Sequence, residues 1–370
     1  MSELKFPEQA LRALAIYIFI SLFGNLPFAS VWSIAGSETL FSKKDQIEFK
    51  NILLPATGSI KLSPAVSLVC SLDEDAIWQL ALSPKSKSFY LGTGRNARLY
   101  RYSPGEKPFL VFSGEKGEIL AVTTRDDGTI FFGTTPEGRV YYLSEGGKGK
   151  AERGRQKVKT LFETEETYIF SLLPVSDGSV LCATGPNGKL FRITPEGKGE
   201  VLFTAPQAHL VSLFWLELGK ELLVGTSPAG IVYRLKFSAW GEKPLVSVLY
   251  DTPQNEVRAI IMGNDQRIYF AANPDDDETS KPTVYCLDRN GFLRWQWSCP
   301  ESTIFSLAWL ENRLIVLTGS AGVVYALDTL GKPAILYRFD AGYAVASALR
   351  AKELYFATAN PSRVYVIRPS

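Results

Sequence analysis

The sequence predicts an all-β fold, a seven-bladed β-propeller of four-stranded blades closed by an N-terminal strand that completes the last blade. Three observations predict it. One unit of strands recurs seven times, with successive openings about 39 to 50 residues apart, as expected for propeller blades. Turn-forming residues recur at corresponding places in several units. The last unit lacks a strand, and a strand without a unit of its own precedes the first.

The repeated unit begins with an apolar strand, crosses a tight turn to a second strand ending in Gly/Ala-Thr, and continues into a third strand that carries an aromatic residue. One clear copy has Ile77-Trp78-Gln79-Leu80, then Gly92-Thr93, then Tyr100. The small residue in the second strand is predicted to let neighbouring blades approach closely. The seven units open at Ile77, Ile119, Ile169, Val211, Val257, Ile304 and Tyr343.

The turns within the units have the residues that tight hairpins require. Asp127-Gly128 and Asp177-Gly178 join first to second strands, where a short hairpin needs positive φ. Pro-x-Gly turns join second to third strands in three units, at residues 136–138, 186–188 and 228–230. This turn chemistry agrees with the strand pattern.

The two ends of the chain are complementary. The chain ends at Ser370, just after the third strand of the seventh unit, so that unit has no fourth strand. Ser67-Leu68-Val69-Cys70 stands before Ile77 at the nearly constant distance that separates the other fourth strands from the next opening. Pairing of this segment with Val364 to Ile367 would complete the last blade and remove an open sheet edge.

With its Gly-Thr, Pro-x-Gly and Val-Tyr-Arg-Leu elements, the chain resembles bacterial propeller-repeat proteins that are similar to WD-repeat proteins, although the Gly-His and Trp-Asp dipeptides are absent. Residues 49–62 are similar to the strap that precedes the first blade in those proteins. Residues 284–288 and 324–328 are similar to quinoprotein-type repeats, a family with quinone-dependent dehydrogenases and a non-enzymatic outer-membrane assembly scaffold. The vicinal cysteine pair and eight blades of the enzymes are not seen, so the resemblance implies a fold and little about function.

An uncharged apolar run extends from Ala13 to Phe23, after Lys5 and Arg12. Its length suits a signal-peptide core better than a membrane span, which needs about 20 residues. A cleaved signal peptide is the leading prediction. An uncleaved membrane tether through residues 13–34 and a cytoplasmic chain with a hydrophobic leader are the alternatives. The predicted organisation is a signal peptide or anchor over 1–35, a strap over 36–64 and the propeller over 65–370, in the periplasm or at the cell surface.

Composition excludes several classes of site. The net charge of +2 gives no overall attraction to nucleic acid or an anionic membrane. A histidine-rich metal centre cannot be built from the single histidine, and a Ser/His/Asp triad would have to use it. This residue, His209, is predicted to be an ordinary histidine in a short connection. The cysteines lack a Cys-x-x-Cys pair and are predicted to be free thiols; they are Cys70, Cys182, Cys286 and Cys299.

Little other chemistry is indicated. The acidic insert Asp275-Asp276-Asp277-Glu278 is a weak candidate for a calcium site, because it lacks the alternating spacing of a known calcium loop and also suits a solvated loop. Inner positions are predicted to be apolar core, at Leu80, Val122, Leu172 and Leu307. No cofactor and no catalytic residue are predicted.

Charge is predicted to be unequal on the two faces of the disc. In a propeller, the loops after the fourth and second strands emerge on one face, and this face is expected to be acidic. The predicted partner-binding residues are Asp73, Glu74, Asp75, Glu115, Glu118, Glu163, Glu165, Glu166, Asp251 and Glu256. The opposite face is expected to be basic through Lys85, Lys87, Lys107, Lys148, Lys150, Arg153, Arg155, Lys157, Lys332 and Lys352. The alternative is that the loops are simply charged.

The leading functional hypothesis is a non-enzymatic, exported propeller that acts as a protein-protein interaction scaffold in an extracytoplasmic or membrane-associated assembly, with a basic partner on the acidic face. One alternative is an exported hydrolase or lyase that acts at the central channel. Another is a ligand-sensing propeller. The sequence indicates neither the partner nor the oligomeric state.

Overall fold

The computed structural model describes residues 65–145, 157–217, 220–240, 242–275, 280–319, 322–339 and 342–368, together with short strands at 32–33, 52–53 and 59–62. Within these ranges all regular structure is β, as the sequence predicts. None of the described residues belongs to a helix long and apolar enough to cross a membrane.

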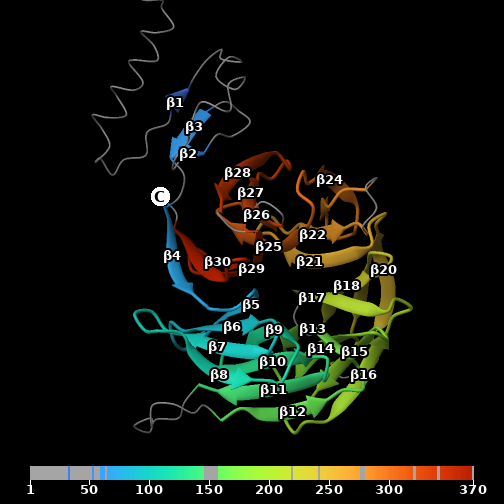
Figure 1. The fold of residues 1–370 in the computed structure, drawn as a ribbon. Helices are drawn as coiled ribbons and strands as arrows, with labels where there is room; N and C mark the ends of the chain where they lie inside the picture. Colours follow the sequence, from blue (N-terminus) through green and yellow to red (C-terminus); the bar gives the residue numbers. More distant parts are fainter. Residues whose placement is uncertain are drawn as a thin grey trace, which may run out of the picture.

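Seven antiparallel sheets of four strands each are arranged in a ring (Figure 1). The innermost strands are β5 (Ile77–Leu82), β9 (Glu118–Thr124), β13 (Tyr168–Pro174), β17 (His209–Glu217), β21 (Glu256–Met262), β25 (Ile304–Leu310) and β29 (Tyr343–Arg350). The second strands are β6 (Phe89–Thr93), β10 (Thr129–Thr135), β14 (Val180–Gly185), β18 (Glu221–Ser227), β22 (Ile268–Asn273), β26 (Arg313–Thr318) and β30 (Glu353–Ala359).

The outer half of each blade follows the same order. The third strands are β7 (Arg98–Tyr102), β11 (Arg139–Ser144), β15 (Lys189–Ile193), β19 (Ile231–Lys236), β23 (Thr283–Leu287), β27 (Val323–Leu327) and β31 (Arg363–Arg368). The outermost strands are β8 (Phe109–Ser113), β12 (Lys159–Glu163), β16 (Gly199–Thr204), β20 (Leu245–Asp251), β24 (Leu293–Ser298), β28 (Pro333–Arg338) and, in the seventh blade, β4 (Ala65–Ser71). Each innermost strand contacts the innermost strand of the next blade, and β29 contacts β5, so the ring is closed.

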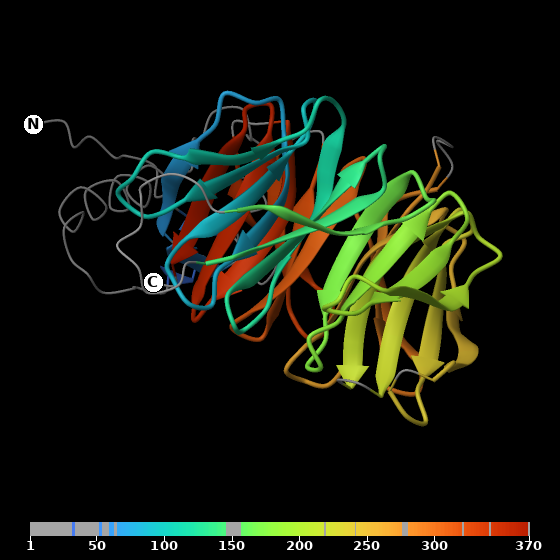
Figure 2. The same ribbon diagram turned by 90° about the horizontal axis from the view of Figure 1, so that it is seen from below.

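The hydrophobic core lies between the blades. Second strands are buried along all or nearly all of their length, as in β10 and β14, because both of their faces are covered by neighbouring sheets. Outermost strands such as β20 are largely exposed. The predicted inner core positions Leu80, Val122, Leu172 and Leu307 are buried as expected. Figure 2, turned by 90°, shows the twisted sheets that form these interfaces side by side.

The small residue in the second strand has the predicted role. A Cβ atom added to Gly92 in β6 would lie 2.7 Å from Cγ2 of Ile119 and 2.8 Å from its carbonyl oxygen. Ile119 belongs to β9 of the next blade and is fully buried. A side chain at position 92 would therefore push two blades apart.

The predicted closure is confirmed. Strand β4 pairs antiparallel with β31, and Val364 stands opposite Cys70, Tyr365 opposite Leu68 and Ile367 opposite Val66. Beyond the strand, the Leu72 amide donates to the Ser362 carbonyl oxygen at 3.0 Å. The last blade thus combines three strands from the C-terminus with one that precedes the first blade.

The predicted strap and leader lie mostly outside the described residues. Of the segment before residue 65, three short strands are described, and they form one antiparallel sheet in the order β1 (Trp32–Ser33), β3 (Ser59–Leu62), β2 (Ile52–Leu53). Strand β2 contacts the outermost strand β28 of the sixth blade. The apolar run at 13–23 is outside the described part of the chain.

All four cysteines are buried and free, as predicted. Burial raises the pKa of each thiol, to about 12 for Cys70 and Cys299 and to about 11 for Cys286. They are small core residues and not reactive thiolates.

Candidate functional site

The loops after second strands and after outermost strands meet on one face, as the antiparallel order of the blades requires. The Asn187 amide, in the loop after β14, donates to Glu166 at 2.9 Å, in the loop after β12. The Gly188 amide donates to the carbonyl oxygen of Ala208, in the loop after β16, at 2.7 Å. We call this side of the disc the acidic face, defined by the ten acidic residues predicted to bind a partner.

Every innermost strand starts at the acidic face and carries a register shift near its start. In β5 the shift lies between Ile77 and Gln79, so Trp78 is the extra residue. Bulges re-aim side chains and are common at rims and next to binding sites. The same interruption occurs between Glu118 and Ala121 in β9. In the other five innermost strands the extra residues are Phe170, Val211, Arg258, Phe305 and Val345.

Aromatic rings stand at the starts of five of these strands, which surround the ring axis. We call Trp78, Tyr168, Phe170, His209, Phe305 and Tyr343 the axial cluster. Tyr168 stacks on Phe170 with ring centroids 5.5 Å apart, and Phe305 meets Tyr343 edge-on at 5.8 Å. Tyr168 is 40% exposed and Tyr343 37%. The axial cluster therefore presents accessible aromatic surface on the acidic face.

His209 is not in a connection, contrary to the prediction. It is the first residue of β17, and its ring lies 5.3 Å from Phe170 and 5.9 Å from Tyr168. The loop reading failed because the strand begins earlier than the apolar pattern at Leu210 indicates. Burial lowers the His209 pKa, and the nearby Glu256 carboxylate only partly offsets this, so the imidazole is neutral at pH 7. Its Nδ1 atom is buried and has no hydrogen-bond partner within the described structure.

The structure places the ten predicted acidic residues in two groups. Six have partners: Glu74 with Arg98, Asp75 with Arg95, Glu118 with Trp78, Glu163 with Arg139, Glu166 with Lys189, and Glu256 with Arg258. The other four are exposed and form no ion pair with another described residue; they are Asp73, Glu115, Glu165 and Asp251. Of the ten, only these four have neither an ion pair nor a hydrogen bond with another side chain in the described part of the chain, so they are the carboxylates best able to meet a partner.

Several polar side chains fix the loops that connect one blade to the next, a role that the sequence reading missed. A Glu or Gln stands three residues before the first buried aliphatic residue of five innermost strands: Glu74, Glu166, Gln207, Gln254 and Glu301. Four accept a hydrogen bond from a third-strand tyrosine: Glu74 from Tyr100 at 2.6 Å, Gln207 from Tyr233 at 3.0 Å, Gln254 from Tyr285 at 2.7 Å and Glu301 from Tyr325 at 3.0 Å. This fixed spacing is the signal that could have identified them.

Glu166 has a different set of donors because the corresponding third-strand residue, Phe191, has no hydroxyl group. Its carboxylate accepts from the Asn187 amide at 2.9 Å, from the Asn187 side chain at 3.1 Å and from Lys189 at 2.9 Å. The Glu166 side chain is fully buried. Burial raises its pKa, but these three donors more than offset the effect, so its pKa lies below the ordinary value.

Glu166→Gln is expected to lower the free energy of unfolding by about 2 kcal/mol at pH 7, because charge-assisted hydrogen bonds to a buried group are lost. A depressed pKa stabilises the fold above the unfolded-state value, and that contribution disappears as the pH falls through the folded-state value. The difference between Glu166→Gln and the unmodified chain should therefore shrink below about pH 4.5. Urea unfolding at several pH values measures it. The exposed neighbour gives the control, since Glu165→Gln should change the free energy of unfolding little. Equal effects of the two substitutions would contradict a stabilising role for the hydrogen bonds of Glu166.

The remaining predicted residues are placed as follows. Asp275 is exposed, whereas residues 276–278 of the weak calcium candidate lie outside the described residues. Within the described ranges no three His, Cys, Asp or Glu side chains lie close enough together to hold a metal ion. On the opposite face, Lys85, Lys87, Lys107, Lys157, Lys332 and Lys352 are exposed, and residues 148–155 fall outside the description.

No protein-family model matches the sequence, and no curated protein matches it either. Solved structures do resemble it. The virginiamycin B lyase from Staphylococcus aureus superposes with a TM-score of 0.67 at 11% identity, over 82% of this chain and 99% of the lyase. A catalytically inactive histidine-to-alanine variant of that lyase with quinupristin aligns equally well.

Two other structures come from different classes of protein. The WD40 repeats of RRP9 align with a TM-score of 0.63 at 12% identity, over 83% of this chain and 98% of that one. The extracellular domain of a B. thetaiotaomicron protein described as a hybrid two-component system aligns with a TM-score of 0.62 at 13% identity, over 82% of this chain and 42% of that one. At such identities the likeness is one of fold. The chain is a seven-bladed propeller-repeat protein.

Proposed function

We propose that this chain is an exported, non-enzymatic propeller that serves as an interaction scaffold and binds a basic protein segment on its acidic face. The observation that carries the proposal is the juxtaposition, on one side of the ring, of accessible aromatic edges in the axial cluster with four uncompensated carboxylates. The apolar run at residues 13–23 supports export. The likeness in fold to an extracellular domain is consistent with it.

The exposed carboxylates and the aromatic rings of the axial cluster suit the same partner, a basic protein segment. Asp73, Glu115, Glu165 and Asp251 attract lysine and arginine side chains over a distance and speed their encounter with the face. The exposed rings of Tyr168 and Tyr343 can hold a cationic side chain by a cation–π contact, which contributes about 0.5–2 kcal/mol. The hydrogen bonds of Glu74 and Glu166 fix the loops that connect neighbouring blades, so little ordering is needed on binding.

The test is affinity capture from native membranes with two variants that change the net charge equally. One carries Asp73→Asn, Glu115→Gln, Glu165→Gln and Asp251→Asn. The control carries Glu106→Gln, Glu200→Gln, Glu242→Gln and Glu311→Gln, four exposed carboxylates outside the acidic face. We expect the first variant to retain roughly a tenth or less of the partner that the unmodified chain captures, and the control to retain most of it. Equal capture by both variants would refute the surface assignment.

A second candidate function, a lyase acting at the same face, is favoured by one observation. The only histidine of the chain lies in the axial cluster, it is held neutral by burial, and a neutral imidazole can accept a proton. The solved lyases provide a direct probe. Turnover of quinupristin by this chain, abolished by His209→Ala, would establish the enzymatic alternative, and no turnover by the unmodified protein removes it.

A further inference from the structure

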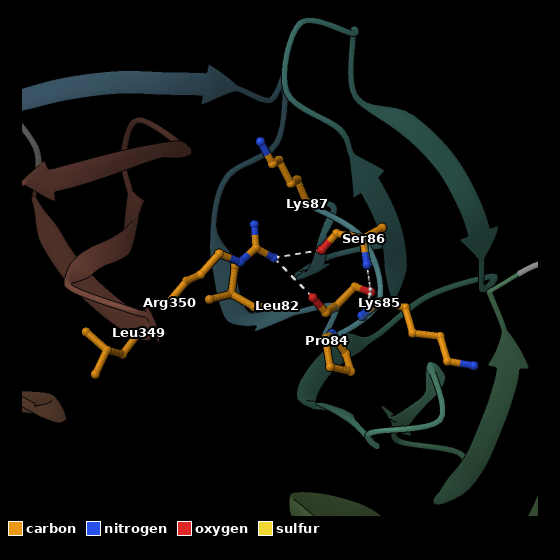
Figure 3. Close-up of a pocket in the computed structure, with 8 residues that line it drawn as sticks. Leu82, Pro84, Lys85, Ser86, Lys87, Leu349 and Arg350 are labelled. Atoms are coloured by element: carbon orange, nitrogen blue, oxygen red, sulfur yellow. Dashed lines mark hydrogen bonds between the residues drawn. The ribbon is translucent and has the colours of Figure 1, made fainter.

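A cavity of about 560 Å³ lies on the face opposite the acidic face, between the first and seventh blades (Figure 3). The turn between β5 and β6 forms one side of it, and the end of β29 forms the other. Its lining holds three cationic residues and no carboxylate: Leu82, Ser83, Pro84, Lys85, Ser86, Lys87, Leu349 and Arg350. A cavity of this size can accept a small organic molecule.

The turn that walls the cavity is anchored from both neighbouring blades. From the second blade, the Glu145 carboxylate accepts hydrogen bonds from Ser83 Oγ, from Ser86 Oγ at 3.0 Å and from the Tyr90 hydroxyl at 3.1 Å. From the seventh blade, Nη2 of Arg350 donates to the carbonyl oxygens of Ser83 and Ser86, each at 3.1 Å (Figure 3). The cavity wall is therefore built in place before any ligand arrives.

Arg350 is held in a fixed orientation with part of its hydrogen-bonding capacity unused. Its guanidinium lies 5.5 Å from the centroid of the Phe89 ring, and only Nη2 donates within the described structure. Glu353 stands opposite Arg350 in the neighbouring strand, and its carboxylate already accepts from Tyr355 at 2.6 Å and from Arg368 at 2.7 Å. A rigid guanidinium with spare donors is suited to an oxyanion.

Lys87 supplies a second positive charge. Its side chain is exposed, it forms no ion pair with another described residue, and Figure 3 shows it on the same side of the turn as Arg350. Lys85 extends away toward the second blade, where its aliphatic chain lies against Gly128. The apolar wall is formed by Leu82, Pro84 and Leu349, and Leu349 is 47% exposed.

We propose that this cavity binds a small organic anion, with its carboxylate, sulfonate or phosphate group at Arg350 and Lys87 and its apolar part against Leu349 and Leu82. The lining combines apolar side chains with a fixed arginine and so provides for both ends of such a molecule. This site lies on the other side of the disc from the proposed partner-binding face and is independent of it.

The test is a fluorescence titration of the full chain with 8-anilinonaphthalene-1-sulfonate, an apolar molecule with one anionic group. Lys87→Gln is expected to weaken binding about threefold and Arg350→Gln about tenfold. Leu349→Ser should weaken it about threefold. Because the attraction is electrostatic, added salt should weaken binding to the unmodified chain more than to Lys87→Gln.

Lys107→Gln is the matched control, since Lys107 is exposed on the same face but does not line the cavity. It should bind the dye as the unmodified chain does. Arg350 also anchors the turn, so the melting temperature of Arg350→Gln is compared with that of the unmodified chain to detect a loss of structure. Lys87 does not anchor the turn, so Lys87→Gln tests the site directly. The proposal is overturned if Lys87→Gln and Leu349→Ser bind the dye with unchanged affinity, or if Lys107→Gln weakens it equally.

Discussion

Replacing Cys70 by aspartate is expected to lower the free energy of unfolding by about 3 to 5 kcal/mol, the cost of an unpaired carboxyl group in the core. Cys70 lies on β4, opposite Val364 of β31, and packs in a cluster with Ile77 and Val364. Because β4 is the strand that closes the ring, loosening it also uncovers β31 as an open edge, which favours aggregation. Urea unfolding and light scattering measure the two consequences.

The same strand provides the matched control. Leu68 lies two residues before Cys70, pairs with Tyr365 and is 56% exposed. Leu68→Asp introduces the same charged group without burying it, and its effect should stay within about 0.5 kcal/mol, as for most surface changes. If Cys70→Asp is as mild as Leu68→Asp, then β4 does not complete the seventh blade.

The second large effect is expected for Gly138→Ala, with a loss of at least about 3 kcal/mol. Gly138 ends a Pro-x-Gly turn with φ of +61°, and an added Cβ would collide with the backbone carbonyl oxygen of Glu166 in the loop that leads to the next blade. The carbonyl oxygen of Gly138 accepts a hydrogen bond from the Thr164 amide at 2.9 Å, so the two loops are already fixed against each other. Positive φ costs an alanine about 1–2 kcal/mol, and displacing the backbone adds to it.

Gly105 separates the cost of positive φ from the cost of displacing the backbone. It also has positive φ, +84°, but an added Cβ would meet nothing within 4 Å. Gly105→Ala should therefore cost only the conformational part, about 1–2 kcal/mol. Urea midpoints of the two variants, compared under identical conditions, give the difference. Similar losses at both positions would mean that the loop around Glu166 yields to the new methyl group.

Local patterns were enough to predict the strands, the turns and the ring. Gly128 and Gly178 have the positive φ that their Asp-Gly turns predict, since tight hairpins restrict backbone angles within a few residues. The closure of the ring by β4 was also predictable, because it depends on counting strands.

The acidic face was predictable only in part. Glu74 and Tyr100 are 26 residues apart in sequence, and Gln254 and Tyr285 are 31 apart, so their hydrogen bonds depend on how the loop before a blade lies against the third strand of that blade. A sequence reading counts Glu74 as surface charge, whereas the folded chain uses it internally. The assembly of Tyr168, Phe170 and His209 was missed for the same reason, since Phe170 and His209 belong to different blades.

The extra residue in each innermost strand is a position at which such a ring can vary. A residue outside the ladder pairing can be exchanged without shifting the register of the strands around it. Trp78, Phe170, Arg258 and Val345 already differ in size and charge at equivalent positions. The axis of the disc is thus surrounded by positions that tolerate substitution. Selectivity for a new molecule can change by substitution in one blade at a time, while the rest of the fold stays the same.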